Sequence, residues 1–227
     1  LGDPAWRAAP RYGGFHERKP LLGQDPPAGD GTAFSVLFDD EALYFAVYCD
    51  DHRPQDLRGR AVQRDSDALY ADDAITIKLD PASDRRTTIG FALNVASGQL
   101  DFRGINESEF RVEFDAVWQG QARRTGSGWT AEFRIPFAAL GLDPGALPGR
   151  VGLNLSRDHS RRNATYDWAL LPPPFSPISA SRYGDLLGLD QGQGAGKGQR
   201  AARRTTFAIL PYLTGLFRTG AVDSDVR

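Results

Sequence analysis

The sequence predicts an all-β protein, a two-sheet antiparallel β-sandwich of the jelly-roll-like kind. Two observations predict it. Short apolar runs alternate with period two, which is typical of strands that bury one face. Turn-forming residues separate these runs, since 25 glycines and 15 prolines occur among the 227 residues. Long helical periods are absent from the pattern, so many short strands favour a sandwich over a fold of alternating strands and helices.

Six strands follow from the alternation, each expected to have one buried face. They cover residues 34–38, 43–49, 75–79, 91–95, 129–135 and 151–155. Turn residues at 39–42 and 96–99 lie between successive runs at hairpin spacing. The best helical candidate is a single turn, Phe137 to Leu140, because it follows Pro136 and stops at Gly141.

Three segments are expected along the chain. Residues 1–190 form the sandwich domain, and residues 191–204 form a linker that contains four glycines between 191 and 199 and no large apolar side chain. Such a segment buries too little surface to offset its ordering entropy. Residues 205–227 then begin a truncated second domain, because a lone strand after a flexible linker is expected to have no sheet to join.

Composition excludes some classes of protein. The net charge is −2 and basic residues are scattered, which argues against a nucleic-acid partner. A chain of this length can bury a core without a disulfide. Cys49 is the single cysteine and continues a buried alternation, so it is expected to be an inert core thiol.

The start of the chain suggests processing. It begins Leu1-Gly2-Asp3 and contains no methionine, so a processed product or a fragment is expected. A removed secretion signal would explain this start, and trimming of a cytosolic protein would look the same. No apolar stretch approaches the roughly 20 residues of a membrane helix. Composition alone therefore leaves the compartment open.

Two segments are more specific than alternation. In residues 65–80, a segment rich in aspartate leads into a predicted strand that ends in Asp80. Residues 128–140 run from Gly128-Trp129 to the predicted helical turn. With residues 39–44 and 182–186, they resemble carbohydrate-binding module family 9. The likeness covers roughly Phe34 to Leu189. It implies a β-sandwich that binds glycans without catalysis.

A bacterial family of unknown function is similar over a longer stretch. In it, such a module follows a signal peptide and precedes an outer-membrane β-barrel, with segments like Gly14-Phe15 and Leu210-Pro211-Tyr212. This resemblance implies a periplasmic or outer-membrane location with the signal peptide removed. It also implies a barrel-like C-terminal domain that serves as partner and attaches the protein to the outer membrane.

The family resemblance also implies where a sugar would bind. In characterised members two tryptophans hold the end of a glycan, while a carboxylate, an arginine and amides bind its hydroxyls. The first tryptophan position falls on Tyr70, which keeps an aromatic face and adds a hydroxyl. The second falls on Pro177, the carboxylate on Thr76 and the arginine on Ala92, whereas the amide is kept as Asn94.

Replacements for the missing groups are expected nearby. Trp168, which precedes the apolar residues 170–175, or Phe175 would replace the missing ring. With Arg157 as a further contact, the candidate ligand-binding set is Tyr70, Asn94, Trp168 and Arg157. Tyr70 could instead simply cap the edge of the sandwich. Core positions are expected for Trp118 and Trp129, and the segment around Trp6 is expected to pack across the sandwich.

Metal and catalytic signals are weak. Asp80 and Asp84 place two carboxylates on one turn, which suits a structural calcium ion, although the spacing is not that of an EF-hand. His16, His52 and His159 are far apart in the sequence, which argues against zinc. Adjacent acidic residues on a strand point to opposite faces, whereas glycoside hydrolysis needs two carboxyl groups that converge. An enzyme is therefore not expected.

Two functions remain open. The leading hypothesis is a non-catalytic carbohydrate-binding module of a larger extracytoplasmic or outer-membrane protein, which binds glycan ends with modest affinity and needs no cofactor beyond possible structural calcium. The alternative is a degenerate structural or gating module that packs on the barrel or on a protein partner and binds no sugar.

Overall fold

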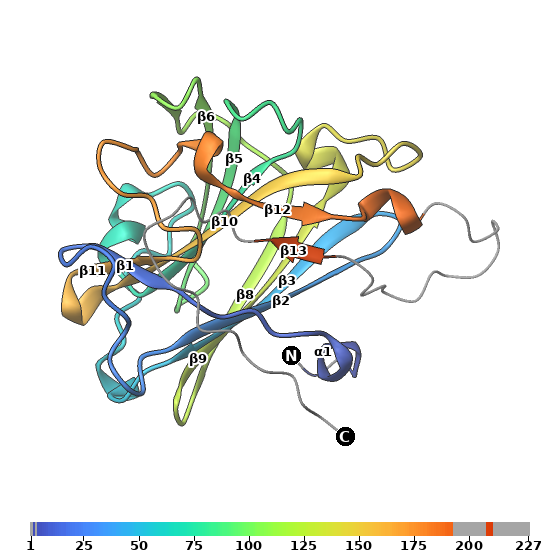
Figure 1. Cartoon of the computed structure of the whole chain (residues 1–227). Coiled ribbons are helices and arrows are strands. Elements are labelled where there is room, and N and C mark those ends of the chain that lie inside the picture. Colours follow the sequence, from blue (N-terminus) through green and yellow to red (C-terminus); the bar gives the residue numbers. More distant parts are fainter. Residues whose placement is uncertain (1, 3, 193–207, 211–227) are drawn as a thin grey trace.

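The computed structural model describes residue 2, residues 4–192 and residues 208–210, and these form a sandwich of two antiparallel sheets (Figure 1). The smaller sheet has the order β2-β3-β9-β8. Its strands are β2 (Thr32–Phe38), β3 (Ala42–Asp50), β8 (Gln119–Thr125) and β9 (Gly128–Pro136).

The larger sheet follows the path β1-β11-β10-β4-β5-β6-β7, with β12 paired to β10 and β13 paired to β12. Its strands are β1 (His16–Lys19), β4 (Ala74–Asp80), β5 (Thr88–Asn94), β6 (Gln99–Ile105), β7 (Glu109–Arg111), β10 (Arg150–His159), β11 (Ala164–Asp167), β12 (Gly184–Leu187) and β13 (Ala208–Leu210).

Helical elements of the described residues are short. They are α1 (Ala5–Ala8) and the 3-10 turns η1 (Pro54–Asp56), η2 (Asp67–Ala71), η3 (Phe137–Leu140), η4 (Ser160–Arg162), η5 (Ala180–Arg182) and η6 (Leu189–Gly192). None of the described helices is long and apolar enough to cross a membrane.

The sequence prediction of the strands is confirmed. The six expected runs correspond to β2, β3, β4, β5, β9 and β10, and the expected hairpins join β2 to β3 and β5 to β6. The helical turn η3 follows Pro136, and Gly141 ends it with a φ of 67°, a left-handed conformation that glycine adopts without strain.

The main core lies between the two sheets. Trp118 is 5% exposed, and its ring lies edge-on to Phe91 of the larger sheet at 5.4 Å and stacks on Phe133 of the smaller sheet at 5.8 Å. Trp129 is also buried, so both tryptophans belong to the core as predicted. Cys49 is buried as well, and this burial raises the pKa of its thiol to about 12.

The outer faces of both sheets are covered too, which corrects the expectation of one buried face per strand. Every residue of β4 and of β5 is buried. On the larger sheet, Leu69 of η2 and Ile178 of the 172–183 segment pack over Phe102 in a second apolar cluster. On the smaller sheet, Trp6 of α1 packs in a cluster with Leu37 and Tyr44. The alternation of apolar residues within a strand could not indicate that distant segments of the chain pack on the outer faces of the sheets.

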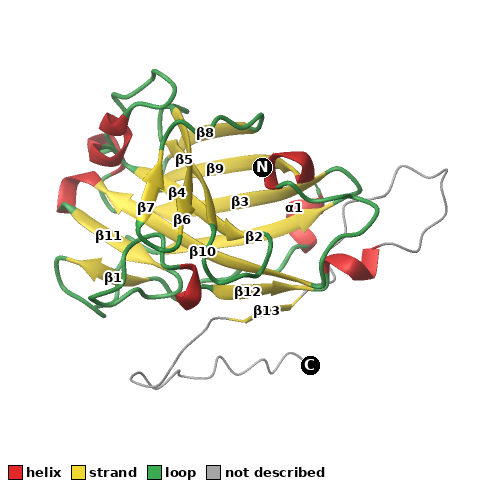
Figure 2. Ribbon diagram, turned by 90° about the horizontal axis from the view of Figure 1, so that it is seen from above, coloured by secondary structure: helices red, strands yellow, loops and turns green. Residues whose placement is uncertain are grey.

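Strand β10 organises the larger sheet. Its residues 152–158 pair with β4 along one edge, while β11 and β12 share the other edge at opposite ends of the strand (Figure 2). β13 pairs with β12, so the expectation that a strand after the linker has no sheet to join is wrong for residues 208–210. Residues 193–207 and 211–227 lie outside the described part, and the linker and second domain stay predictions.

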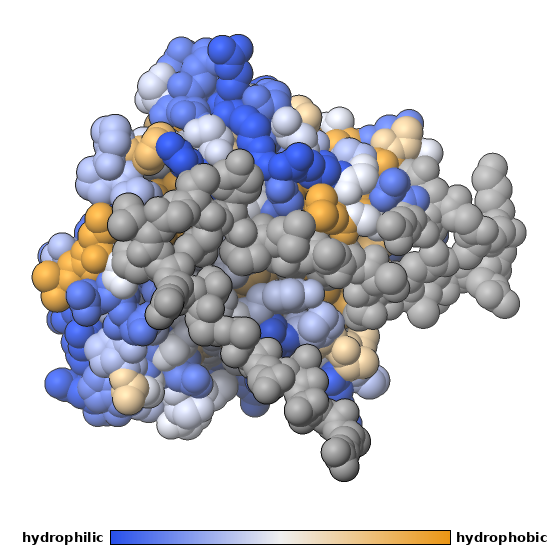
Figure 3. Space-filling model, in the orientation of Figure 1, coloured by the Kyte–Doolittle hydropathy of each residue, from blue (hydrophilic) through white to orange (hydrophobic). Residues whose placement is uncertain are grey.

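The surface in the view of Figure 3 is hydrophilic over most of its coloured area, and the hydrophobic residues form small separate groups. A surface of this kind suits contact with water.

Candidate binding site

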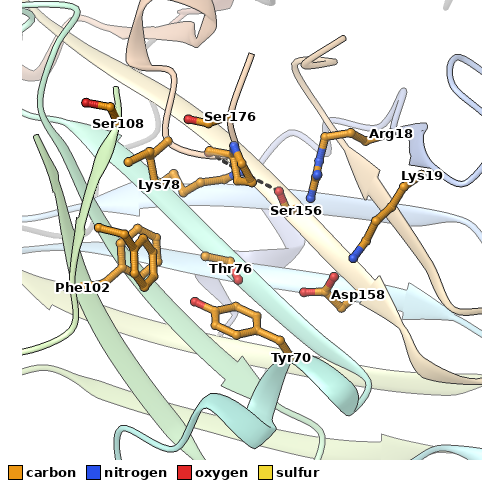
Figure 4. A pocket seen from close by; sticks show the side chains of 13 residues that line it. Arg18, Lys19, Tyr70, Thr76, Lys78, Phe102, Ser108, Ser156, Asp158 and Ser176 are labelled. Atoms are coloured by element: carbon orange, nitrogen blue, oxygen red, sulfur yellow. Dashed lines mark hydrogen bonds between the residues drawn. The ribbon is translucent and has the colours of Figure 1, made fainter. Parts of the chain in front are cut away.

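A cavity of about 370 Å³ lies on the outer face of the larger sheet (Figure 4). Its floor comes from two neighbouring strands: Thr76 and Lys78 on β4, and Ser156 and Asp158 on β10. These residues alternate with core residues such as Ile77, so the same strands present apolar side chains to the core and polar side chains to the cavity. The register pairs Thr76 with Ser156, which brings the two polar rows side by side.

Lys78 is the most constrained residue of the floor. It is 2% exposed, and its Nζ donates hydrogen bonds to Ser156 Oγ at 2.6 Å and to the Pro177 carbonyl at 3.2 Å. The nearest carboxylate oxygen, Asp167 Oδ1, is 4.0 Å away. Burial lowers the pKa of Lys78 to about 8, against an opposing effect of Asp167. The ammonium therefore stays mostly charged at neutral pH.

Two further cations come from β1. Arg18 and Lys19 line the same cavity, and Figure 4 shows them entering from the side of Asp158. The Arg18 Nε lies 2.9 Å from Asp167 Oδ2, which is fully buried behind the floor. Asp158 accepts a hydrogen bond from Thr165 Oγ1 at 2.6 Å, and burial raises the pKa of its carboxyl group.

Tyr70 forms another part of the wall, near Asp158. It lies in η2, is 37% exposed, and directs its ring into the cavity beside Thr76 (Figure 4). Burial raises the pKa of its hydroxyl, with contributions from Asp158 and Asp67, so the phenol is protonated and can donate a hydrogen bond. The Thr76 hydroxyl oxygen is buried and has no hydrogen-bond partner among the described residues.

Aromatic and apolar side chains complete the wall. Phe102 of β6 and Phe110 of β7 both line the cavity, with ring centroids 4.5 Å apart. Phe110 is 45% exposed. Pro177 and Ile178 close the cavity from the 172–183 segment. The cavity therefore combines aromatic faces with polar groups, as small-molecule sites do.

Only one of the four predicted ligand-binding residues, Tyr70, lines this cavity. Asn94 is fully buried; its amide donates to the Ala61 carbonyl and to Asp72 Oδ2, and its oxygen accepts from two backbone N–H groups of its turn. Trp168 packs edge-on against Phe34 at 5.4 Å in the core. Neither side chain is placed to touch a ligand in the cavity.

Arg157 is likewise a structural residue. It has the inward direction of Leu155 on β10, and its guanidinium donates to the carbonyls of Asp30, Gly31 and Asp50 and to Thr32 Oγ1. It therefore ties the larger sheet to β2 and β3. Arg157 does not line the cavity, and its predicted sugar contact stays a prediction.

More of the positions that the family resemblance assigns to sugar contact line this cavity than of the four predicted ligand-binding residues. Tyr70, Thr76 and Pro177, onto which the resemblance placed both tryptophans and the carboxylate, all line the cavity. Ala92 lies opposite Thr76 and belongs to the apolar cluster around Phe102. The sequence reasoning missed Lys78, whose outward direction follows from its alternation with Ile77. It also missed the long-range neighbours from β1, β6 and β7.

The proposed calcium ligands have other partners. Asp80 accepts hydrogen bonds from the backbone N–H groups of Asp84 and Arg85, and Asp84 accepts from those of Arg86 and Thr87. Within the described residues these two carboxylates do not join a third potential ligand. The turn is thus stabilised by its own carboxylates, and calcium binding there stays a prediction.

The chain does bring potential metal ligands together elsewhere. His159 is buried, with its Nε2 3.4 Å from Asp51 Oδ2 and its Nδ1 3.7 Å from Asp73 Oδ1. Arg161 Nη2 lies 3.1 Å from Asp51 Oδ1 and supplies a counter-charge. Burial, followed by the charge of Arg157, lowers the pKa of His159 to about 4, so its ring is neutral near pH 7.

Comparison with known proteins gives structural matches only. No family model and no curated protein matches the sequence. A carbohydrate-binding module family 9 from Caldicellulosiruptor kristjanssonii, in complex with glucose, has a TM-score of 0.58 at 16% identity, covering 82% of this chain and 86% of that chain.

Further structures agree with this match. The same kind of module in complex with cellotriose has a TM-score of 0.56 at 15% identity, covering 82% and 85% of the two chains. A structure from Bacteroides uniformis has a TM-score of 0.58 at 14% identity, covering 80% and 87%. The chain therefore has the β-sandwich fold of carbohydrate-binding module family 9.

Proposed function

We propose that the protein is a non-catalytic carbohydrate-binding module that holds the end of a glycan in the cavity beside Tyr70. One observation carries this proposal: three positions that the family resemblance assigns to sugar contact, Tyr70, Thr76 and Pro177, line one cavity. The Tyr70 ring offers a face for the C–H groups of a sugar ring. The unpartnered hydroxyl of Thr76 can bond a sugar hydroxyl.

Affinity is expected to be modest. A small cavity with a few aromatic faces and a few polar anchors gives a limited interaction energy, part of which offsets the loss of ligand freedom. The lack of catalysis is supported by the lining, because Asp158 is the single carboxylate among the described residues that line the cavity. Hydrolysis of a glycosidic bond generally uses two converging carboxyl groups.

The test is calorimetric titration of the protein with a panel of neutral and acidic oligosaccharides. Removal of the ring and hydroxyl in Tyr70→Ala should weaken binding by about tenfold, since the two contacts together contribute about 1.4 kcal/mol. Tyr48→Ala is the matched control, because Tyr48 is also half-buried but lies on β3 of the smaller sheet. Equal effects of the two substitutions would remove the proposed site.

The second candidate is a structural or gating module that binds no sugar. It is favoured by the placement of Asn94, Trp168 and Arg157, whose polar and aromatic groups serve the fold instead of a ligand. Under this alternative, no member of the panel binds.

The cellular setting is also a proposal. The resemblance of Gly14-Phe15 and Leu210-Pro211-Tyr212 to the bacterial family supports a periplasmic or outer-membrane location, with an outer-membrane barrel as the following domain. Fractionation of cells that express the natural full-length protein tests it. Recovery in the cytosolic fraction would refute this location.

A further inference from the structure

We propose that the ligand of this cavity is an acidic sugar, a glycan end that carries a carboxylate beside Lys78, Arg18 and Lys19. The inference rests on the proposed function and adds the chemical class of the ligand. It depends on the charge of the lining, on the environment of one buried ammonium and on the position of the aromatic rings.

The charges near the cavity do not balance. Three cations line it, namely Lys78, Arg18 and Lys19, against one lining carboxylate, Asp158. Even when the buried Asp167 behind the floor is included, three positive charges face two negative charges. Desolvation also favours the neutral form of Asp158, whose pKa is raised by burial. An anion in the cavity would compensate the excess.

Lys78 shows where this anion would lie. Both of its hydrogen bonds go to uncharged oxygens, Ser156 Oγ and the Pro177 carbonyl. Its nearest carboxylate, Asp167, already pairs with Arg18 and accepts a 2.5 Å hydrogen bond from Ser156. An ammonium has three donors, and a buried charge is unfavourable unless it is paired. The Lys78 Nζ also lies 6.0 Å from the centroid of the Tyr183 ring, and a ligand anion would give the buried ammonium the charged partner that this ring does not supply.

The rest of the lining indicates a sugar and not a bare anion. Tyr70 lines the cavity together with the cations, and Phe102 and Phe110 form an aromatic wall of the same cavity (Figure 4). A pyranose ring with a carboxylate at one end offers both an apolar C–H face and a charge. Its ring can therefore contact Tyr70 while its carboxylate faces Lys78 and the β1 cations.

The experiment compares matched ligands that differ in charge. Short oligomers ending in glucuronic or galacturonic acid are titrated against their methyl esters, which keep the ring and lose the negative charge. We expect the acids to bind at least about tenfold more tightly, because hydrogen bonds to charged groups contribute more than neutral ones. The preference should decrease at high salt.

Variants connect this preference to the cavity. Lys78→Met should abolish the preference for acid over ester, and Lys19→Gln at the rim should reduce it. Arg123→Gln is the control, since Arg123 is an exposed cation on β8 outside the cavity. Lys19→Gln and the salt dependence decide the matter if Lys78→Met fails to fold.

The possible failures are distinguishable. Equal binding of acids and esters, or binding of neutral glycans alone, would overturn the acidic ligand while leaving a carbohydrate-binding module. Binding of no glycan would overturn the proposed function and this inference together. Equal competition by acetate, which has the carboxylate without the ring, would overturn the assignment to a sugar.

Discussion

Replacement of Lys78 by methionine is predicted to stabilise the protein while it damages the site. The pKa of Lys78 is about 8 in the folded protein and 10.5 in the reference state. A difference of 2.5 units corresponds to about 3 kcal/mol at about 1.4 kcal/mol per unit. Below pH 8 both states hold the proton, so this unfavourable free energy is fully present at pH 7.

Removal of the ammonium leaves few groups unpaired. The Pro177 carbonyl still accepts a hydrogen bond from the Tyr183 hydroxyl, and Ser156 still donates to Asp167. Methionine is an apolar side chain of similar length. The free energy of unfolding of Lys78→Met should therefore exceed that of the natural protein by about 1–3 kcal/mol at pH 7, with loss of the Asp167 attraction lowering the gain.

The pH dependence makes the reasoning testable. As pH rises from 8 to 10.5, the folded protein loses this proton before the unfolded chain does, so the penalty declines. At pH 9.5 less than half of the penalty at pH 7 remains. Urea denaturation of both proteins at pH 7 and pH 9.5 measures the difference, in which other titrating groups cancel. A variant that is less stable at pH 7, or a difference independent of pH, would refute the argument.

Three further predictions concern other sites. Gly90→Ala places a Cβ about 2.1 Å from the Phe102 ring, so the ring must shift; we expect a loss of about 1–3 kcal/mol in urea denaturation, partly rescued by Phe102→Leu. For His159 the unfolded chain takes up a proton below pH 6.5 and the folded protein only near pH 4, so stability should fall with acidification across this window; His159→Gln should show a shallower dependence, and equal slopes would contradict it. Cys49, with a thiol pKa of about 12, should react with a disulfide reagent only after unfolding, as measured by absorbance.

Alternation predicted the strands because the core between the sheets selects apolar residues at every second position. The alternation did not predict β8, because Gln119–Thr125 is an edge strand with mostly exposed side chains and no row of apolar residues. The same alternation could have predicted which face of the sheet some of the cavity-lining side chains occupy. Lys78 and Thr76 must point away from the core that Ile77 enters, and Arg157 must point into it.

The remaining parts of the site depend on contacts between residues far apart in the sequence. Nothing in residues 16–19 indicates that Arg18 lies near Asp167, because β1 reaches that position only through pairing with β11. Asn94 has the outward direction expected of a ligand residue. Its hydrogen-bonding capacity is taken up by Asp72 and the Ala61 carbonyl, which arrive from a separate loop. The sequence around Asn94 does not show that residues from another loop use its hydrogen-bonding groups.

Strand β4 contributes side chains both to the core and to the cavity floor, so the cavity forms only if this strand pairs in its native register. Ile77 enters the core, while the next residue, Lys78, lies in the cavity floor. A slip of one residue during folding would drive the ammonium between the sheets and expose the isoleucine, and both exchanges are unfavourable. A chain misaligned in this way would be less stable than the native one, and its Lys78 would no longer line the cavity.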